Sequence, residues 1–234
     1  MKRYFEVFDL IELQSTFYKL PSVETAKKWR DEAPPNFIYT MKAWQALTHP
    51  PSSPTWRKSG LKISSEDYGK YGHLKPTREN FQAWERTLEV ARALMCSVLV
   101  LQMSPSFIKS NENISNVVSF LNNVERPQGL VIGIEFRHNS WDVETIRKLC
   151  EKLEIIHIVD PFKQSLATTL SQVIYYRLHG LGRRAYVYDY SMEELRHLYE
   201  RWVKPYEKDK IVYVLFNNTN MANDALDFKK IVVT

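Results

Sequence analysis

Seven short apolar runs, each ending in polar residues, recur along this chain of 234 residues. In the run LVIGIEFR, β-branched and apolar residues give way to Glu135 and Arg137 at the end. A run of this length that is apolar on both faces is typical of a buried strand in a parallel sheet. The predicted strands are Leu10–Gln14, Phe37–Lys42, Ser97–Gln102, Leu130–Arg137, Ile155–Asp160, Val173–His179 and Ile211–Asn218.

Segments with helical periodicity separate most of these runs. Thr77–Met95 is the longest, with Phe81, Trp84 and Leu88 at spacings of three and four. Strands that alternate with helices predict a parallel sheet, because each crossover must return over the face of the sheet. Seven such units without a break predict an α/β fold, a single TIM-like (β/α) barrel domain over residues 1–234. The other predicted helices are Ser22–Ala33, Ile114–Val124, Asp142–Leu153, Ser191–Lys204 and Asn223–Val233, and only the link Phe162–Gln172 is too short for a helix.

The polar endings of the runs are predicted to gather at one end of the barrel. In the fourth strand, alternation places Glu135 and Arg137 on one face and Ile132 and Ile134 on the other. Parallel strands end at the same edge, so the endings form a polar ring at the C-terminal face, where barrel enzymes keep their active sites. The predicted ring contains Glu12, Lys42, Gln102, Glu135, Arg137, Asp160, Arg177, His179 and Asn217, with Thr16, Tyr18, His49, His138 and Asn218 nearby.

The cations of the ring predict an anionic substrate. Lys42, Arg137 and Arg177 suit a phosphate or a carboxylate, to which a guanidinium group presents a planar fork of donors. The remaining predicted substrate-binding residues are Glu12, Thr16, Tyr18, His49, Gln102, His138, Asn217 and Asn218.

The other charged and polar endings predict acid–base chemistry. Glu135 or Asp160 is the predicted general base, and His179 is its acid–base partner because an imidazole titrates near neutral pH. Gln102 and Asn217 would orient the substrate without changing its charge. We therefore expect an enzyme of the hydrolase or lyase type that acts on an anionic or phosphorylated small molecule.

Two other interpretations of the ring stay open. The first is an ion-paired plug that closes the barrel, in which each charge is satisfied by a neighbour and no chemistry occurs. The second is a divalent metal site, although no HxH or HExxH spacing is present and three cations compete for the carboxylates. No cofactor is predicted, and the residues able to hold a metal are Glu12, Glu135, Asp160, His138 and His179.

Two long connections suggest a different function. Residues 48–76 are rich in Pro and Ser and carry basic and aromatic side chains, which favours a lid over the C-terminal face, with a merely tolerated insertion as the alternative. Residues 180–190 (GLGRRAYVYDY) combine glycines with Arg183 and Arg184. The alternative function is a nucleic-acid-binding barrel in which these arginines and residues 48–76 grip the phosphate backbone.

Composition narrows the class of protein only slightly. The net charge of +5 favours anionic partners weakly, because basic and acidic residues are interspersed. No stretch has the roughly 20 apolar residues of a membrane helix, and the N-terminus does not resemble a signal peptide. Cys96 and Cys150 fit no metal-binding or redox spacing, so we expect a cytoplasmic protein with ordinary thiols. The sequence does not indicate an oligomeric state.

The residues at the predicted strand ends also resemble a known family pattern. The matching segments run in the family's order along nearly the whole chain: IELQSTFYKLPS (11–22), MKAWQALTH (41–49), LVLQMSPSF (99–107), IEFRHNSW (134–141), VD (159–160), YRLHG (176–180) and YVLFNNT (213–219), followed by Ala222 and Ala225. They are similar to the YecE-like family, also called domain of unknown function 72. The resemblance implies a TIM-barrel-like fold and no established activity.

The chain departs from the family pattern at two places. The family usually opens with a first strand that carries a Gly-rich, Trp-containing motif, so the resemblance implies that this usual first strand is missing and that seven strands remain. Gln14 stands where the family typically has Asn, which moves the amide by one methylene group.

Overall fold

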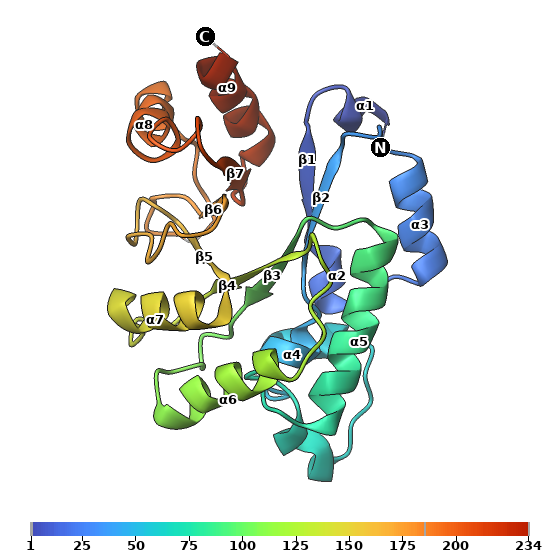
Figure 1. The fold of residues 1–234 in the computed structure, drawn as a ribbon. Helices are drawn as coiled ribbons and strands as arrows, with labels where there is room; N and C mark the ends of the chain where they lie inside the picture. Colours follow the sequence, from blue (N-terminus) through green and yellow to red (C-terminus); the bar gives the residue numbers. More distant parts are fainter. Residues whose placement is uncertain (1, 185, 234) are drawn as a thin grey trace. The chain divides into compact units, whose positions relative to one another are not determined.

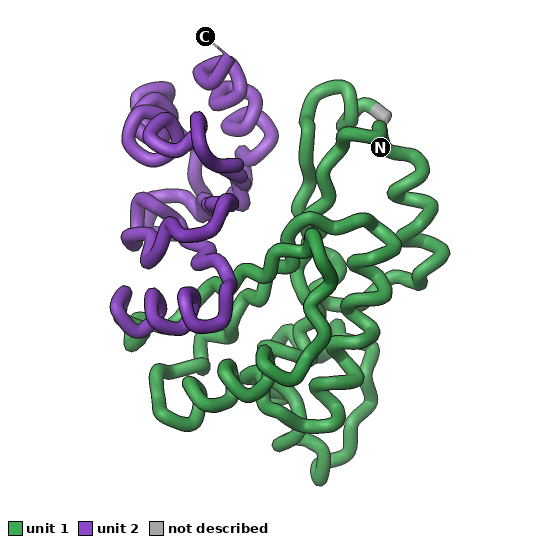
Figure 2. Tube along the Cα trace, in the orientation of Figure 1, with its two compact units in different colours: residues 1–142 green, residues 143–234 purple. Residues whose placement is uncertain are grey.

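A computed structural model describes residues 2–184 and 186–233 of the chain. The chain divides into two compact units, residues 1–142 (unit 1) and residues 143–234 (unit 2), which are coloured separately in Figure 2. The expectation of a single domain over residues 1–234 stays a prediction.

Unit 1 contains a sheet of four parallel strands in sequence order, which are β1 (Leu10–Leu13), β2 (Ile38–Lys42), β3 (Val98–Gln102) and β4 (Val131–Glu135). The register aligns Gln102 with Glu135, and Glu12 with Thr40. The polar endings of β3 and β4 therefore lie side by side at one edge of the sheet.

Three longer helices connect these strands: α3 (Val23–Asp31), α5 (Arg78–Ala93) and α6 (Asn111–Asn122). Each begins after a side-chain cap, because the hydroxyl groups of Ser22, Thr77 and Ser110 accept a backbone N–H of the first turn. Helices α3 and α5 lie side by side against the sheet (Figure 1). The shorter elements of unit 1 are α1 (Lys2–Phe5), α2 (Ser15–Tyr18), α4 (Gln45–Thr48) and the 3-10 helices η1 (Pro54–Lys58) and η2 (Ser65–Lys70).

The core of unit 1 lies between β3 and its helices. Residues 98–101 of β3 are fully buried, as expected for a parallel strand that is covered on both faces. Trp84 of α5 and Phe120 of α6 are also buried and meet edge to face, with ring centroids 5.7 Å apart. Burial of their apolar area stabilises this part of the sheet.

Unit 2 contains three parallel strands in sequence order, β5 (Ile156–Val159), β6 (Val173–Leu178) and β7 (Ile211–Phe216). Its helices are α7 (Val143–Leu153), α8 (Met192–Leu198), which continues as a π-helical turn at Tyr199–Val203, and α9 (Met221–Val233). A capping box between Ser191 and Glu194 starts α8.

The predicted elements are confirmed. All seven strands form within the predicted runs, all six predicted helices are present, and the link between β5 and β6 has no helix in the described chain. The fold is therefore a TIM-like (β/α) barrel fold with seven parallel strands. Among the described residues, no helix combines the length and apolar character required to cross a membrane.

The long connection after β2 is more structured than its Pro- and Ser-rich sequence suggests. It contains η1 and η2 and then folds back onto α4, where Gly72 N donates to Ala46 O and Leu74 N donates to Leu47 O, both at 2.8 Å. Gly72, His73 and Leu74 all have positive φ angles, of 77°, 53° and 50°. Whether this connection acts as a lid stays a prediction.

Gly72 is required where this connection meets α4. A Cβ atom at position 72 would lie 2.6 Å from the backbone carbon of His49, whereas one at Gly129 would meet nothing within 4 Å. Both glycines have positive φ angles, so replacing either strains the backbone by about 1–2 kcal/mol.

We predict that Gly72→Ala lowers the free energy of unfolding by about 3 kcal/mol or more, because the backbone clash adds to the strain. Gly129→Ala is the matched control and should cost only the strain. Urea unfolding of the two variants measures the difference. Equal losses would show that the close approach to His49 contributes nothing.

Candidate functional site

Glu135 and Arg137 form an ion pair at the end of β4. The Arg137 Nη2 lies 3.0 Å from Glu135 Oε1 and donates to Gln102 Oε1 at 3.1 Å. The Glu135 side chain is 5% exposed, so its charge lies largely out of water. The predicted proximity of these three endings is confirmed. The shared contact also fixes the orientation of the guanidinium group.

The ends of β1 and β2 bring a second group of predicted residues together. The Gln14 amide donates to the Glu12 carboxylate, and Thr16 Oγ1 donates to the backbone oxygen of Lys42 at 2.7 Å. The Lys42 ammonium lies 4.4 Å from the centre of the Phe17 ring, a cation–π contact. Short helix α2 thus folds against the end of β2.

Tyr18, the last residue of α2, lies next to the residues at the ends of β1 and β2. Its ring is half-buried and lies 5.0 Å from the ammonium of Lys58, a residue of η1. This contact joins the end of α2 to the long connection.

His49 is buried near the basic side chains at these strand ends. Its ring is buried, its Nδ1 lies 2.9 Å from Thr48 Oγ1, and it meets the Phe17 ring edge to face. Burial, followed by the charges of Lys42, His73 and Arg137, lowers the pKa of His49 to about 3. Burial is the largest cause of this shift, and the neighbouring cations Lys42 and Arg137 add to it. We call Glu12, Lys42, His49, Gln102, Glu135 and Arg137 the unit 1 cluster.

Three residues beside this cluster were not predicted from the sequence. His73 Nε2 lies 3.1 Å from Ser104 Oγ and 3.2 Å from Ser106 Oγ. Ser104 and Ser106 follow β3 directly, so their position after a strand end was a usable signal. His73 comes from the long connection, and its sequence gives no sign that the connection folds back there.

His138 makes a local contact after β4. Its Nδ1 lies 2.8 Å from Ser140 Oγ and accepts the backbone N–H of Ser140 at 3.1 Å. The ring is half-buried and is held by a residue only two positions away. Its predicted role in substrate binding stays a prediction.

In unit 2, Asp160, His179 and Asn217 lie together. Asp160 Oδ2 accepts the backbone N–H of His179 at 3.0 Å, and its other oxygen accepts the N–H of Phe162 at 3.2 Å. The His179 Nδ1 lies 3.2 Å from the Asn217 amide nitrogen. Asp160 thus hydrogen-bonds to the backbone of His179, and Asn217 contacts its ring.

Two other predicted residues of unit 2 are buried. Arg177 is fully buried on β6, opposite Leu215 of β7. The Asn218 amide donates to Asp224 Oδ2 at 2.5 Å and to the backbone oxygen of Tyr188 at 2.8 Å. Asn218 therefore ties the segment after β6 to α9.

Residues 180–190 follow β6 and include Ala185, which lies outside the described residues. Arg183 and Arg184 are exposed there. Gly180 has a φ of 82°, and a Cβ atom on it would lie 2.4 Å from that of Tyr188, so this turn requires glycine. The predicted contact of these arginines with phosphate groups stays a prediction.

The described residues show no group of three or more His, Cys, Asp or Glu side chains arranged to hold a metal ion. In unit 1, the cations Lys42 and Arg137 stand among the carboxylates, and Arg137 pairs with Glu135. A metal site therefore stays an untested alternative.

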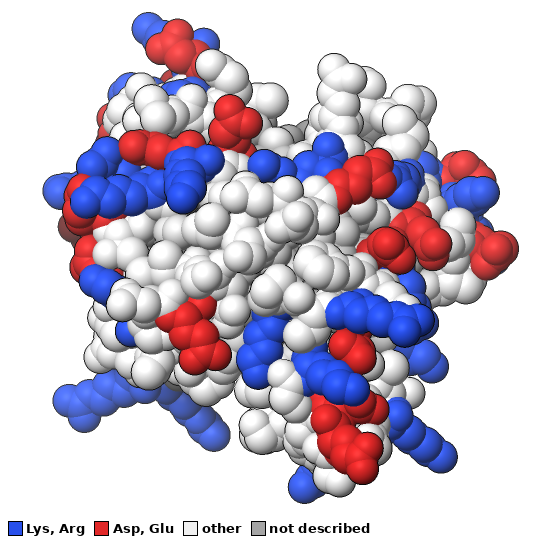
Figure 3. Space-filling view, turned by 60° about the horizontal axis from the view of Figure 1, so that its bottom comes forward, with Lys and Arg blue, Asp and Glu red and all other residues white. Residues whose placement is uncertain are grey.

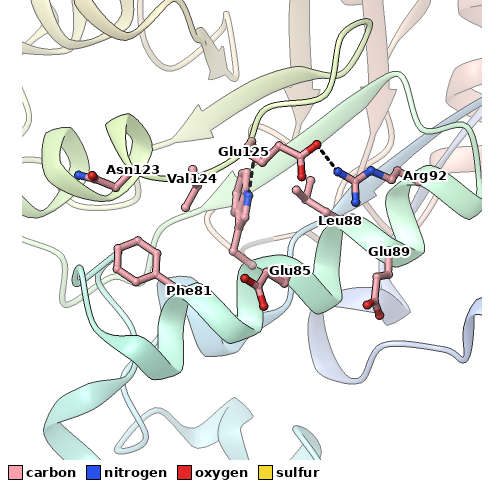
Figure 4. Close-up of a pocket in the computed structure, with 9 residues that line it drawn as sticks. Phe81, Glu85, Leu88, Glu89, Arg92, Asn123, Val124 and Glu125 are labelled. Atoms are coloured by element: carbon pink, nitrogen blue, oxygen red, sulfur yellow. Dashed lines mark hydrogen bonds and ion pairs between the residues drawn. The ribbon is translucent and has the colours of Figure 1, made fainter.

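A hollow of about 460 Å³ lies elsewhere on unit 1, between α5 and the segment that follows α6 (Figure 4). The Trp84 indole donates to Glu125 O at 2.9 Å at its edge, and Arg92 pairs with the Glu125 carboxylate. This segment leads into the start of β4, whereas the unit 1 cluster lies where the strands end. The hollow is therefore separate from the candidate site.

We predict that His49 stays neutral down to about pH 3 and makes stability depend on pH. Its folded-state pKa lies below the ordinary 6.5, so the unfolded chain binds the proton first. The stabilising effect is present above pH 6.5 and is lost as the pH falls toward 3. Between pH 7 and pH 5, the wild type should lose about 2 kcal/mol more unfolding free energy than His49→Gln. An NMR titration in which the His49 ring protonates near pH 6.5 would contradict this.

The whole chain matches known proteins of one family. A family model described as protein of unknown function DUF72 matches residues 1–232. The UPF0759 protein YunF of Bacillus subtilis is 23% identical over 257 aligned positions, covering 97% of this chain and 83% of YunF.

Solved structures agree with this match. A DUF72 protein of Thermotoga maritima is 26% identical with a TM-score of 0.74, covering 100% of this chain and 88% of the other. A DUF72 protein of Enterococcus faecalis is 21% identical with a TM-score of 0.73, covering 99% and 92%. Endonuclease IV of Thermus thermophilus, 13% identical with a TM-score of 0.58 over 99% and 91%, shares the fold alone. The chain belongs to the DUF72 family, as the strand-end motifs suggest.

Proposed function

We propose that this protein is an enzyme of the hydrolase or lyase type that acts on an anionic, phosphorylated small molecule at the C-terminal ends of its strands. The observation that carries the proposal is the position of Lys42 and Arg137 at these strand ends, where their positive potential adds to burial in lowering the pKa of His49 to about 3. A phosphate group is the ligand that such a potential stabilises.

Lys42 and Arg137 are the proposed phosphate-binding residues. Lys42 is 7% exposed and lies over an aromatic ring, so little water screens its charge. The Arg137 guanidinium is held by Glu135 and Gln102 through Nη2, which orients its planar donors before a ligand arrives. Pre-orientation lowers the entropic cost of binding.

Glu135 is the proposed general base. Its carboxylate is buried next to the phosphate-binding cation, so a substrate held by Arg137 would present its reacting proton close to an acceptor. In unit 2, Asp160 and His179 are proposed for the same chemistry, with Arg177 and Asn217 as substrate-binding residues. Each role is proposed within its own unit.

The plug interpretation is the first competitor. Burying Glu135 and Arg137 costs several kcal/mol before their attraction is counted, and apolar residues of the same volume often stabilise a core more. Retention of charges at strand ends therefore suits a binding role better than a packing role.

The two buried cysteines are free thiols, which suits the proposed cytoplasmic location.

Nucleic-acid binding is the second candidate. It is favoured by the exposed Arg57, Lys58 and Lys62 on the long connection after β2. Endonuclease IV, whose name states an action on nucleic acid, shares the fold but only 13% of the sequence. On the face drawn in Figure 3, Lys and Arg side chains lie in several separate groups around an uncharged centre, most of them beside Asp and Glu side chains. We therefore rank this candidate second.

We predict that Lys42→Gln and Arg137→Lys each weaken the binding of phenyl phosphate by about 10- to 100-fold, because a charge-assisted hydrogen bond contributes about 1.5–3 kcal/mol. Calorimetric titration at low ionic strength measures the affinity, and Lys62→Gln on the exposed connection is the matched control, which should bind as the wild type does. Melting temperatures confirm that each variant is folded.

Absence of phosphate binding to the wild type, together with a higher unfolding free energy of Glu135→Gln, would replace the proposal with the plug interpretation. Oligonucleotide binding whose affinity falls steeply with salt, and which Arg57→Gln and Lys62→Gln weaken, would favour the second candidate.

A further inference from the structure

His73, Ser104 and Ser106 form a closed triangle of hydrogen-bonding groups. His73 Nε2 lies 3.1 Å from Ser104 Oγ and 3.2 Å from Ser106 Oγ, and the two hydroxyl oxygens lie 2.9 Å apart. Ser104 is 2% exposed, whereas Ser106 is exposed to solvent. One hydroxyl group is thus accessible to a substrate and the other is enclosed beside it.

His73 lies in a strained segment of backbone. Gly72, His73 and Leu74 are three successive residues in the left-handed region, which side chains other than glycine rarely adopt. Hydrogen bonds to α4 on either side and full burial of Leu74 maintain this conformation. Backbone strain of this kind persists where the surroundings enforce it, and it concentrates at functional positions.

The surroundings of His73 keep its ring neutral. Burial and the nearby charge of Lys75 lower its pKa, against the opposing charge of Glu112 on α6. His73 also interacts electrostatically with His49, which is itself neutral at ordinary pH. A neutral ring with Nε2 toward two hydroxyl groups is able to accept a proton from either.

We propose that His73 and Ser106 form a Ser–His dyad that hydrolyses carboxylic esters, with Ser104 as a positioning residue that holds both groups. This inference goes beyond the proposed phosphate-binding function and does not depend on it. Ser106 is the nucleophile because its oxygen is accessible, and His73 is the general base because its Nε2 is within hydrogen-bond distance.

The steps balance with water as the second reactant. The Ser106 oxygen bonds to the acyl carbon as its proton moves to His73 Nε2. The ester C–O bond then breaks, and the leaving alcohol takes that proton. Water next attacks the acyl carbon and gives a proton to Nε2. The bond between the acyl carbon and Oγ breaks, and Ser106 recovers its proton as the acid departs.

His138 and Ser140 form a second His–Ser pair, which serves as a matched control. Ser140 Oγ lies 2.8 Å from His138 Nδ1, but that nitrogen already accepts the backbone N–H of Ser140 at 3.1 Å. The Ser140 oxygen in turn accepts the backbone N–H of Lys109 at 2.7 Å. Both atoms are therefore engaged with the backbone, and Ser140 is not expected to react.

The test uses a fluorophosphonate probe, which bonds to activated serine residues with loss of fluoride. We expect one label on the intact wild-type chain, located at Ser106 by peptide mass spectrometry and absent in Ser106→Ala. His73→Gln keeps a hydrogen-bonding amide but no base, so its labelling rate should fall at least about 100-fold while its melting temperature is maintained. Ser140→Ala should label as the wild type does.

The pH dependence of the labelling rate shows whether His73 acts as a base or only holds the serines in place. The labelling rate should rise to a plateau with a midpoint below pH 6.5, because the pKa of His73 lies below that ordinary value. No label at Ser106, or a rate that His73→Gln leaves unchanged in a folded protein, would overturn the dyad. Labelling without phenyl phosphate binding would support the dyad and refute the proposed function, and the reverse result would do the opposite.

Discussion

The ion pair between Glu135 and Arg137 is the constraint on which the candidate site depends. The two residues lie two positions apart at the end of one strand, so the pleat directs them to the same face. A buried carboxylate without a partner would cost several kcal/mol, and Arg137 offsets that cost. The same guanidinium group contacts Gln102 on the neighbouring strand, so a single pair joins the ends of β3 and β4.

The second constraint is the turn at residues 72–74. Left-handed backbone at three successive positions allows the long connection to fold back against α4. That return carries His73 to the serines after β3 and close enough to His49 to affect its pKa. The connection therefore packs against α4 and places a histidine beside these serines. The long connection thus brings an imidazole ring to the strand ends of unit 1.

The strand endings were predictable because two simple rules act together. Alternation along a strand assigns the face of Glu135 and Arg137, and parallel pairing brings Gln102 beside them. The fold followed from the same pattern of apolar runs and helices. The parts of the site that follow from strand alternation and strand pairing were therefore predictable from the sequence.

The remaining features depend on contacts between distant segments. The position of His73 follows from hydrogen bonds between residues 72–74 and α4, which no local pattern encodes. Asp160 bonds to the backbone of His179 and not to its ring, a choice that side-chain type does not reveal. Asn218 is engaged by Asp224, which lies on the following helix. Polar residues at strand ends thus divide between those that bond to backbone groups and those that pair with other side chains, and only the structure separates them.

The most direct test of the central claim is a crystal structure of the protein soaked in tungstate, a phosphate mimic with a strong anomalous signal. We predict an anomalous peak within hydrogen-bond distance of the Lys42 ammonium and the Arg137 guanidinium groups. A structure without a peak there, in which carboxylates fill every donor position of both cations, would contradict it.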